Sequence, residues 1–415
     1  MSRGDRRELA VRALPRVLAL TASLACSLGG ARPIPVSALS SPNGAAIYDV
    51  ALRGSVAFVV AGNAVHTFDV SDATAPRPLG VYRHNADIEA IEALDRRMVV
   101  RSGIEIQILD VSDPARPRKL AGRPLPDIAP TGGPTAPDAS SLQVGASDDF
   151  VVAACTTRFA DGYGIVAHAA EIDAAGVGPW REAWRMAVDD FHTLLAPTAV
   201  AVAETQAFVA FTKGYRGVHS STFVQVIDLA DGSTSAEPDL TLHGASIQQL
   251  LVRPQRLLAH TASGLFPPET LSGLLVLEHG PDGLRTIGMQ AVEETSPAAI
   301  AESGGLAWLA MPDGEVARVD VSRDALADVD RGTLPWSPTA LAVDGALAVV
   351  AHSPNAVGLV RWPVGGMIET WPLFEPWDGR TGVASTLYLP HALSAFRGDD
   401  DRATRAVEPV AWAPK

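Results

Sequence analysis

The chain has 415 residues, of which 47% are hydrophobic and 19% are charged, and its formal net charge is −14. This apolar content is enough to bury a large core and excludes disorder over most of the chain. The negative charge, with no basic face in the sequence, excludes nucleic acid as a partner. The 36 glycines and 31 prolines lie between short apolar runs, which is typical of an all-β protein with many turns.

The first 31 residues resemble an export signal. Arginines at positions 3, 6, 7 and 12 precede the apolar run 17–25, and small residues offer cleavage sites after Ala25 or Ala31. The run is too short to span a bilayer as a mature helix. We therefore predict that residues 1–31 are a signal peptide and that the protein is exported, as a periplasmic or outer-envelope lipoprotein or as a secreted protein.

Cys26 occupies the position of the lipidated cysteine in a bacterial lipobox. Ser23 stands where that motif has an apolar residue, and Arg16 shortens the apolar run. Release without a lipid, twin-arginine export through Arg6-Arg7 and a cytoplasmic location therefore stay open as alternatives. Membrane contact is expected only through this lipid anchor.

The second cysteine, Cys155, lies in the apolar run 150–155. If Cys26 is lipidated or removed, no internal disulfide is possible. The apolar surroundings predict that Cys155 is an inert core thiol.

A phrase at residues 68–80 returns at residues 109–122, with an offset of 41 residues. A period of about 40 residues built from short apolar strands indicates a β-propeller. The end of the third apolar run marks seven repeats, and in six of them an acidic residue stands there. The positions are Asp69, Asp110, Asp173, Asp228, Glu278, Asp320 and, as a degenerate case, Arg361. Successive positions are 41, 63, 55, 50, 42 and 41 residues apart. We predict an all-β, seven-bladed β-propeller of four-stranded antiparallel blades over residues 32–374.

Each repeat divides into four strand-like runs. The first repeat places them at 46–52, 56–60, 65–70 and 77–82, and the later repeats begin with runs at 88–94, 142–146, 199–203, 247–252, 298–301 and 339–343. Pairing of residues 35–39 with the last blade is one way to close the ring. Residues 375–415 are predicted to be a C-terminal tail that packs on the propeller or is partly ordered.

The phrase Asp-Val-Ser-Asp-Pro at residues 110–114 has a structural explanation. Asp110 ends the third strand, Ser112 and Asp113 are expected to cap backbone amides, and Pro114 fixes φ in the turn. The phrase lacks the central glycine and distal glutamate of an EF-type calcium loop. It therefore predicts a turn and not a calcium site.

The phrases at 68–80 and 109–122 resemble the LVIVD-repeat family of exported or surface β-propeller proteins of bacteria and archaea. The likeness weakens at residues 319–322 and 227–230. The resemblance implies a propeller outside the cytoplasm. It brings no established catalytic residues.

Three repeats carry extra residues between the second and third strands, at 156–164, 212–221 and 261–272. We expect them to be long loops that gather on one sector of one face, where binding sites are often built. The aromatic and cationic residues among them suit a protein, peptide or glycan surface. The candidate binding residues are Arg158, Phe159, Tyr163, Tyr215, Arg216, His219 and Phe266. Loops that pack on each other are the alternative.

Three histidines precede first strands of repeats, at His84, His192 and His243. If they converge on a channel mouth, they are candidate ligands for zinc, copper or iron. No paired histidine motif supports this, and solvated or hydrogen-bonded loop histidines are the alternative. No other cofactor is predicted.

Nucleophilic catalysis has no support, because the sequence lacks a Gly-x-Ser-x-Gly elbow, a Ser-x-x-Lys motif and a glycine-rich phosphate loop. The eight tryptophans are expected to pack in the core or between blades, and stacking on a cofactor is the alternative. The sequence therefore predicts a monomeric binding or scaffold module that presents one face to a protein or glycan partner at the bacterial envelope. The alternatives are an enzyme at the channel mouth, either a metal-dependent oxidase or a lactonase-like hydrolase, and a purely structural envelope protein.

Overall fold

The computed structural model describes residues 47–374, apart from 127–141, 160–161, 175, 189–192, 216–217, 236–237, 244, 254–255, 264–271, 281–282, 293–296, 324–325 and 353–355. The predicted signal peptide with Cys26, the closing segment 35–39 and the tail 375–415 lie outside the described residues. The described residues form no helix that is long and apolar enough to cross a membrane.

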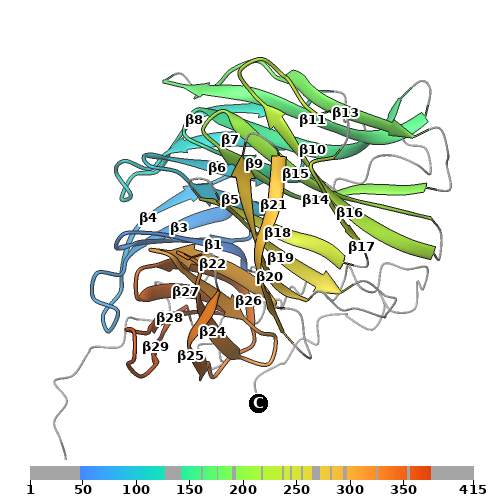
Figure 1. Ribbon diagram of the computed structural model, residues 1–415. Helices are drawn as coiled ribbons and strands as arrows, with labels where there is room; N and C mark the ends of the chain where they lie inside the picture. The colour runs from blue at the N-terminus through green and yellow to red at the C-terminus, as the bar shows by residue number, and fades with distance from the viewer. Residues whose placement is uncertain are drawn as a thin grey trace, which may run out of the picture. The chain divides into compact units, whose positions relative to one another are not determined.

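The described chain forms seven sheets of four antiparallel strands and no helix (Figure 1). Blades 1 to 3 comprise β1 (Ile47–Arg53), β2 (Val56–Ala61), β3 (Ala64–Asp69), β4 (Arg77–Arg83), β5 (Ala90–Ala93), β6 (Arg97–Ser102), β7 (Glu105–Asp110), β8 (Arg118–Pro124), β9 (Gln143–Ala146), β10 (Phe150–Phe159), β11 (Gly162–Asp173) and β13 (Arg181–Val188), with the two-residue β12 (Gly176–Val177) beside β11.

Blades 4 to 7 follow in the same order. They comprise β14 (Thr193–Ala203), β15 (Gln206–Tyr215), β16 (Val218–Asp228), β17 (Leu240–His243), β18 (Ala245–Arg253), β19 (Arg256–Ser263), β20 (Gly273–Gly280), β21 (Gly283–Ala291), β22 (Ala299–Ser303), β23 (Leu306–Ala310), β24 (Glu315–Asp320), β25 (Ala327–Thr333), β26 (Pro338–Asp344), β27 (Leu347–His352), β28 (Ala356–Arg361) and β29 (Glu369–Phe374). The predicted seven-bladed propeller and its repeat register are confirmed.

The core lies between neighbouring blades, because the two faces of each sheet are buried against the sheets on either side of it. The same packing joins the two ends of the ring. Val59 and Phe68 of blade 1 share a buried cluster with Val349 and Leu359 of blade 7, and the Gly54 amide donates to Asp344 Oδ2 at 2.5 Å. Blade 7 draws all four of its strands from residues 338–374. Among the described residues, the ring is therefore closed by sheet faces and not by an exchanged strand.

The repeated Asp-Val-Ser-Asp phrase forms the predicted turn after the third strand. Asp110 Oδ1 accepts the Ser112 amide at 3.0 Å, and Asp113 Oδ1 accepts the Ala115 amide at 3.1 Å. The expected role of Ser112 is wrong, because its hydroxyl donates to Asp110 at 2.6 Å and caps no amide. Arg118 Nη2 donates to Asp110 Oδ2 at 2.8 Å and closes the turn.

Carbonyls in this turn also receive a side chain from the preceding blade. The donor–acceptor pairs are Thr67 to Pro114, Arg123 to Val177, Arg181 to Leu229, Arg256 to Val321 and Arg318 to Trp362. These bonds join blades 1–2, 2–3, 3–4, 5–6 and 6–7. At these five junctions the turn thus fixes one blade against the preceding one and also shapes its own strand ends.

Arg318 is the most buried of the arginines that make this contact. Its side chain is 1% exposed and pairs with Asp330. The guanidinium carbon lies 4.0 Å from the Trp362 ring centre and 5.4 Å from that of Trp308. Both tryptophans are fully buried, which agrees with their predicted role in blade packing.

A substitution at Gly80 tests the contact between β4 of blade 1 and the repeated turn of blade 2. A Cβ at Gly80 would lie 2.5 Å from the Ala115 carbonyl oxygen in the turn of blade 2. We expect Gly80→Ala to lower the free energy of unfolding by about 1–3 kcal/mol, because backbone must move to accept the methyl group. Denaturant unfolding measures this. The matched control is Gly280→Ala, where nothing lies within 4 Å of the added Cβ; equal stability losses in the two variants would contradict the docking.

Candidate functional site

The first strands of the seven blades surround a central cavity of about 590 Å³. Its lining includes small apolar residues at one repeated position, namely Ala51, Ala201, Ala301 and Ala342, with Leu251 in blade 5. Blade 2 has Glu92 at this position. One carboxyl group therefore breaks the near-symmetry of an otherwise apolar ring.

Two further polar side chains in the channel join neighbouring blades. Asp49 Oδ2 accepts the Ile91 amide at 2.9 Å, and Gln249 Oε1 accepts the Ile300 amide at 3.2 Å. Asp49 and Gln249 occupy equivalent register positions, opposite Val60 and His260. They therefore fix one first strand to the next in blades 1–2 and 5–6.

The channel carboxyl groups hold their protons unusually strongly. Burial raises the pKa of Glu92 to about 8, against the opposing effect of a hydrogen bond from the Ala146 backbone, and the nearby Asp49 adds to the rise. Burial also raises the pKa of Asp49 to about 6, although the backbone amides of Ile91 and Val50 and the charge of Arg101 oppose it. At neutral pH the Glu92 carboxyl is therefore mainly uncharged.

The chemistry of the channel is limited by its lining. Glu302 is buried, pairs with Arg253 and accepts the Gly305 amide at 2.6 Å. The described residues of the lining include no serine, cysteine or histidine. Glu92 is able to hold or release a proton there, but these residues supply no hydroxyl, thiol or imidazole nucleophile.

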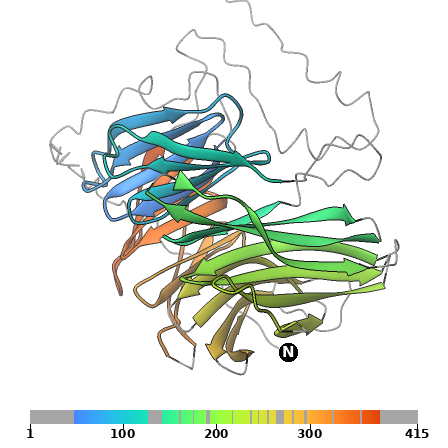
Figure 2. The same cartoon turned by 90° about the horizontal axis from the view of Figure 1, so that it is seen from above.

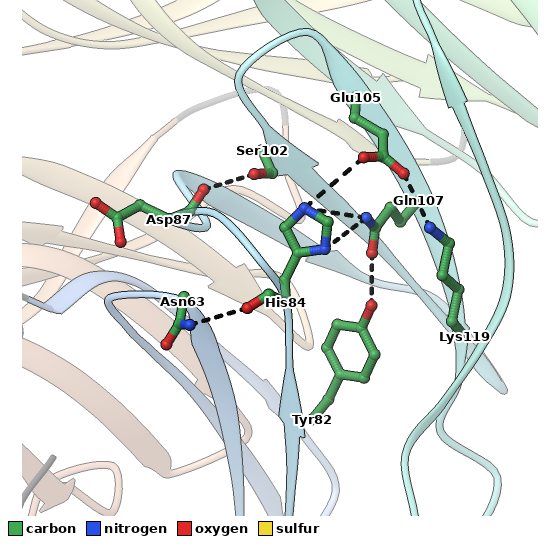
Figure 3. A network of polar contacts seen from close by, with 8 residues as sticks. All are labelled: Asn63, Tyr82, His84, Asp87, Ser102, Glu105, Gln107 and Lys119. Atoms are coloured by element: carbon green, nitrogen blue, oxygen red, sulfur yellow. Dashed lines mark hydrogen bonds and ion pairs between the residues drawn. The ribbon is translucent and has the colours of Figure 1, made fainter. Parts of the chain in front are cut away.

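His84 lies in a polar network between blades 1 and 2 (Figure 3). Gln107 Nε2 lies 2.8 Å from His84 Nδ1, and Glu105 Oε2 lies 3.7 Å from His84 Nε2. Gln107 Oε1 in turn accepts the Tyr82 hydroxyl at 2.7 Å. Both ring nitrogens of His84 therefore face protein groups.

The candidate metal histidines have different surroundings. His243, in β17, contacts the Ser221 hydroxyl at 2.9 Å, and His192 lies outside the described residues. In the part of the chain that the structure describes, no three His, Cys, Asp or Glu side chains form a group that could hold a metal ion. A metal centre formed by His84, His192 and His243 stays a prediction.

Blades 3 and 4 are longer than the others. Their β10, β11, β14, β15 and β16 have 10, 12, 11, 10 and 11 residues, whereas β2, β3, β6 and β7 have six each. The long strands lie side by side in green in Figure 2. We call their added part the blade 3–4 extension, defined as residues 156–159, 162–166, 184–188, 193–197, 211–215 and 218–223.

The structure of the extension shows that the prediction of long loops is wrong for two segments. The segments 156–164 and 212–221, expected to be loops, consist mostly of paired hairpin strands that end at Phe159↔Gly162 and Tyr215↔Val218. Their β-branched and aromatic residues favour a pleated, half-buried strand, and this preference exceeds the loop signal of their polar residues. The third segment, 261–272, is described only at its ends.

The predicted binding residues are distributed over both hairpins. Arg158, Phe159 and Tyr163 lie at the end of the β10–β11 hairpin, with Arg158 opposite Tyr163. Tyr215 and His219 lie at the end of the β15–β16 hairpin. Arg216 and Phe266 lie outside the described residues. The backbone thus brings each group of described candidates to one hairpin end.

The extension has a small hydrophobic core of its own. Ile165, Leu195 and Phe211 are 0%, 2% and 0% exposed, and they come from β11, β14 and β15. The Phe211 ring centre lies 5.5 Å from that of Trp184 and 5.4 Å from that of Phe223. This cluster joins the two long blades beyond the length of the other blades and makes the extension a packed structure.

No protein-family model matches the chain, and no curated protein matches it. Solved structures with a similar fold include the computationally designed Ika8 protein, with a TM-score of 0.46 and 12% identity over 80% of this chain and 98% of that one. Saccharomyces cerevisiae Sqt1 has a TM-score of 0.44 and 10% identity over 80% and 87% of the two chains. A chain of a mitotic checkpoint complex has a TM-score of 0.48 and 13% identity over 79% and 90%. These likenesses carry no information on ligand or activity, and membership of the LVIVD-repeat family stays a prediction.

Glu92 gives the propeller a testable pH dependence. The unfolded chain releases this proton near the ordinary value of 4.5, whereas the folded protein keeps it to about pH 8. The folded state therefore binds more protons in this window, so stability falls as pH rises from about 5 to 8. We expect Glu92→Gln to flatten this fall in a plot of Tm against pH and to raise Tm at pH ~9. The exposed carboxyl of Glu171 is the control, and a Glu171→Gln variant that flattens the curve equally would contradict the assignment.

Proposed function

We propose that the protein is an exported binding module whose blade 3–4 extension receives a protein partner. The observation that carries this proposal is the separate core formed by Ile165, Leu195 and Phe211. Blades 1, 2 and 7 are complete with inner strands of four to seven residues, so the ring does not require the longer ones. A preorganised surface on a rigid scaffold lowers the entropy cost of binding.

The composition of the extension favours a protein over a glycan. Trp184, Met186 and Val188 remain partly exposed along β13, at the edge of the small core. Exposed cations also occur on strands of the extension, at Arg185 in β13, which pairs with Glu182, and at Lys213 in β15. Aromatic and methionine side chains with arginine at the rim are typical of protein interfaces. Export is supported by the arginine-rich and apolar residues 1–31.

An enzyme site in the channel is the second candidate. It is supported by the raised pKa of Glu92, because strongly shifted carboxyl groups in cavities are often functional. The support is weaker, because the Ala146 amide gives the same carboxyl a structural partner.

Site-specific photo-cross-linking tests the binding proposal. A photoreactive amino acid is placed at Phe159 or at Tyr215 in the full chain, expressed in its native cells. The control position is the exposed Thr74, in the turn after β3. We expect one common product from both hairpin ends and none from Thr74. A product that loses its added mass on glycosidase treatment identifies a glycan and contradicts the protein partner. Absence of product at the hairpin ends, or the same product at Thr74, contradicts the extension as the binding surface.

A further inference from the structure

A groove of about 380 Å³ lies at the junction of blades 1 and 2, beside the turns that follow β1 and β7. Its lining includes Val56 of β2 and the turn residues Val111 and Ser112. All lining residues belong to the segment 47–126, which the structure describes without a gap. The volume is at the lower end of the range of ligand pockets and is sufficient for one long side chain.

In three other junctions, an arginine of the preceding blade donates to the first carbonyl after the third strand. The pairs are Arg181 to Leu229, Arg256 to Val321 and Arg318 to Trp362. In the second pair, Nη1 of Arg256 lies 2.5 Å from the Val321 oxygen and 3.0 Å from the Arg323 oxygen. The propeller thus repeats a site in which backbone carbonyls bind a guanidinium group.

Val111 carries the equivalent carbonyl in blade 2, and its backbone is held as in blade 6. The Val111 amide donates to the carbonyl of the residue before β6 at 2.9 Å, and the Val321 amide donates to that of the residue before β23 at 2.9 Å. The next amide of each turn, which shares a peptide plane with the carbonyl in question, donates to the aspartate that ends the third strand, at 3.0 and 2.9 Å. The two carbonyls therefore have the same direction, toward the preceding blade. Within residues 47–126, no amide or side chain donates to the Val111 oxygen.

Blade 1 supplies no arginine to this carbonyl. By strand pairing, the positions in blade 1 that correspond to Arg256, Arg318 and Arg181 hold Val56, Thr67 and Gly80. Val56 and Gly80 have no side-chain donor. The Thr67 hydroxyl donates instead to the Pro114 carbonyl, at 2.5 Å. Val56 and Val111 both line the groove, which therefore occupies the place that an arginine fills between blades 5 and 6.

The charges at the groove favour a cation over an anion. Arg53 and Arg96 also line it, but both pair with Asp95, at 2.7 and 3.7 Å. An anion would therefore compete with a carboxylate for these arginines. A guanidinium group meets no competing donor from residues 47–126 at the Val111 oxygen. The partly exposed Val56 offers apolar contact to the aliphatic stem of an arginine.

We propose that the blade 1–2 groove receives an arginine side chain of a protein partner, with the Val111 carbonyl as its acceptor. The partner supplies at this junction the contact that Arg256 supplies within the chain. The groove lies at the turns after the first and third strands, whereas the blade 3–4 extension lies at the hairpin ends between the second and third strands. The arginine site is therefore a second contact of the binding module.

NMR spectroscopy of the full chain, labelled with ¹³C-carbonyl valine and ¹⁵N-serine, tests the proposal. Only the four Val-Ser pairs of the sequence give a signal, at residues 36–37, 70–71, 111–112 and 321–322. The probe is arginine with an acetylated amino group and a methylamide end, which resembles an arginine within a polypeptide. We expect it to shift the Val111–Ser112 signal. The Val321–Ser322 signal is the matched control and should not move, because Arg256 already donates to the Val321 carbonyl.

Three further probes identify the ligand. Blocked citrulline has the shape of the arginine probe without its charge, so its affinity should be at least about tenfold lower. Inorganic phosphate tests Arg53 and Arg96 as an anion site and should not reproduce the shift. Free arginine tests a small molecule as the source of the guanidinium group and should bind no more tightly than the blocked probe.

The variant Val56→Arg completes the test. It introduces into β2 the residue that β19 has at the equivalent position, so the response to blocked arginine should disappear. An unaltered Val321–Ser322 signal shows that the variant folds; if it does not fold, the citrulline comparison in the unaltered protein decides.

Five results would each overturn the proposal. They are an unmoved Val111–Ser112 signal with blocked arginine, equal affinity for citrulline, the same shift with phosphate, tighter binding of free arginine, and an unchanged response in folded Val56→Arg. None of them bears on the blade 3–4 extension, whose cross-linking test uses other residues, so failure here leaves the proposed function untouched.

Discussion

Each blade must bury both faces of its sheet, and only the neighbouring blades can cover those faces. The second and third strands are accordingly buried along most of their length, as in β2, β10 and β28. The same requirement explains the side chains that reach to turn carbonyls of the next blade, such as Arg256 and Arg318. A misplaced blade would lose apolar burial and these hydrogen bonds together. Packing between faces also closes the ring at blades 1 and 7, where the described sheets exchange no strand.

This constraint determines where the fold tolerates change. The inner strands cannot move sideways without separating blades, but a hairpin can lengthen beyond the ring, provided that the added strands are packed. Blades 3 and 4 have lengthened together and share the cluster around Phe211. Single residues can also change where a blade needs only a small side chain, as at Glu92 and His260. The candidate sites are therefore departures from the repeat.

The sequence predicts those features of the fold that depend on local and periodic patterns of residues. The repeated acidic residues give the blade number and register, because most of them, such as Asp69, Asp110 and Asp320, end a third strand and accept an amide of the following turn. The prediction of loops for the lengthened hairpins is wrong, because polar residues such as Thr156 and Arg158 interrupt the apolar pattern by which a strand is recognised in the sequence. The contacts of Glu92 with Ala146 and of His260 with Pro297 join residues 54 and 37 positions apart. No local pattern indicates them, because they depend on how one blade is rotated against the next.

Hydrogen–deuterium exchange tests most directly whether the blade 3–4 extension is a packed part of the propeller. Amides of residues 163–166 and 211–214 should exchange slowly, close to the rate of the buried strand residues 57–60 in blade 1. Phe211→Ala should accelerate exchange in the extension and leave residues 57–60 unchanged, because the removed ring belongs to the separate core. Exchange of the extension in the unaltered protein at the rate of an unstructured peptide would contradict a rigid binding surface built from these two blades.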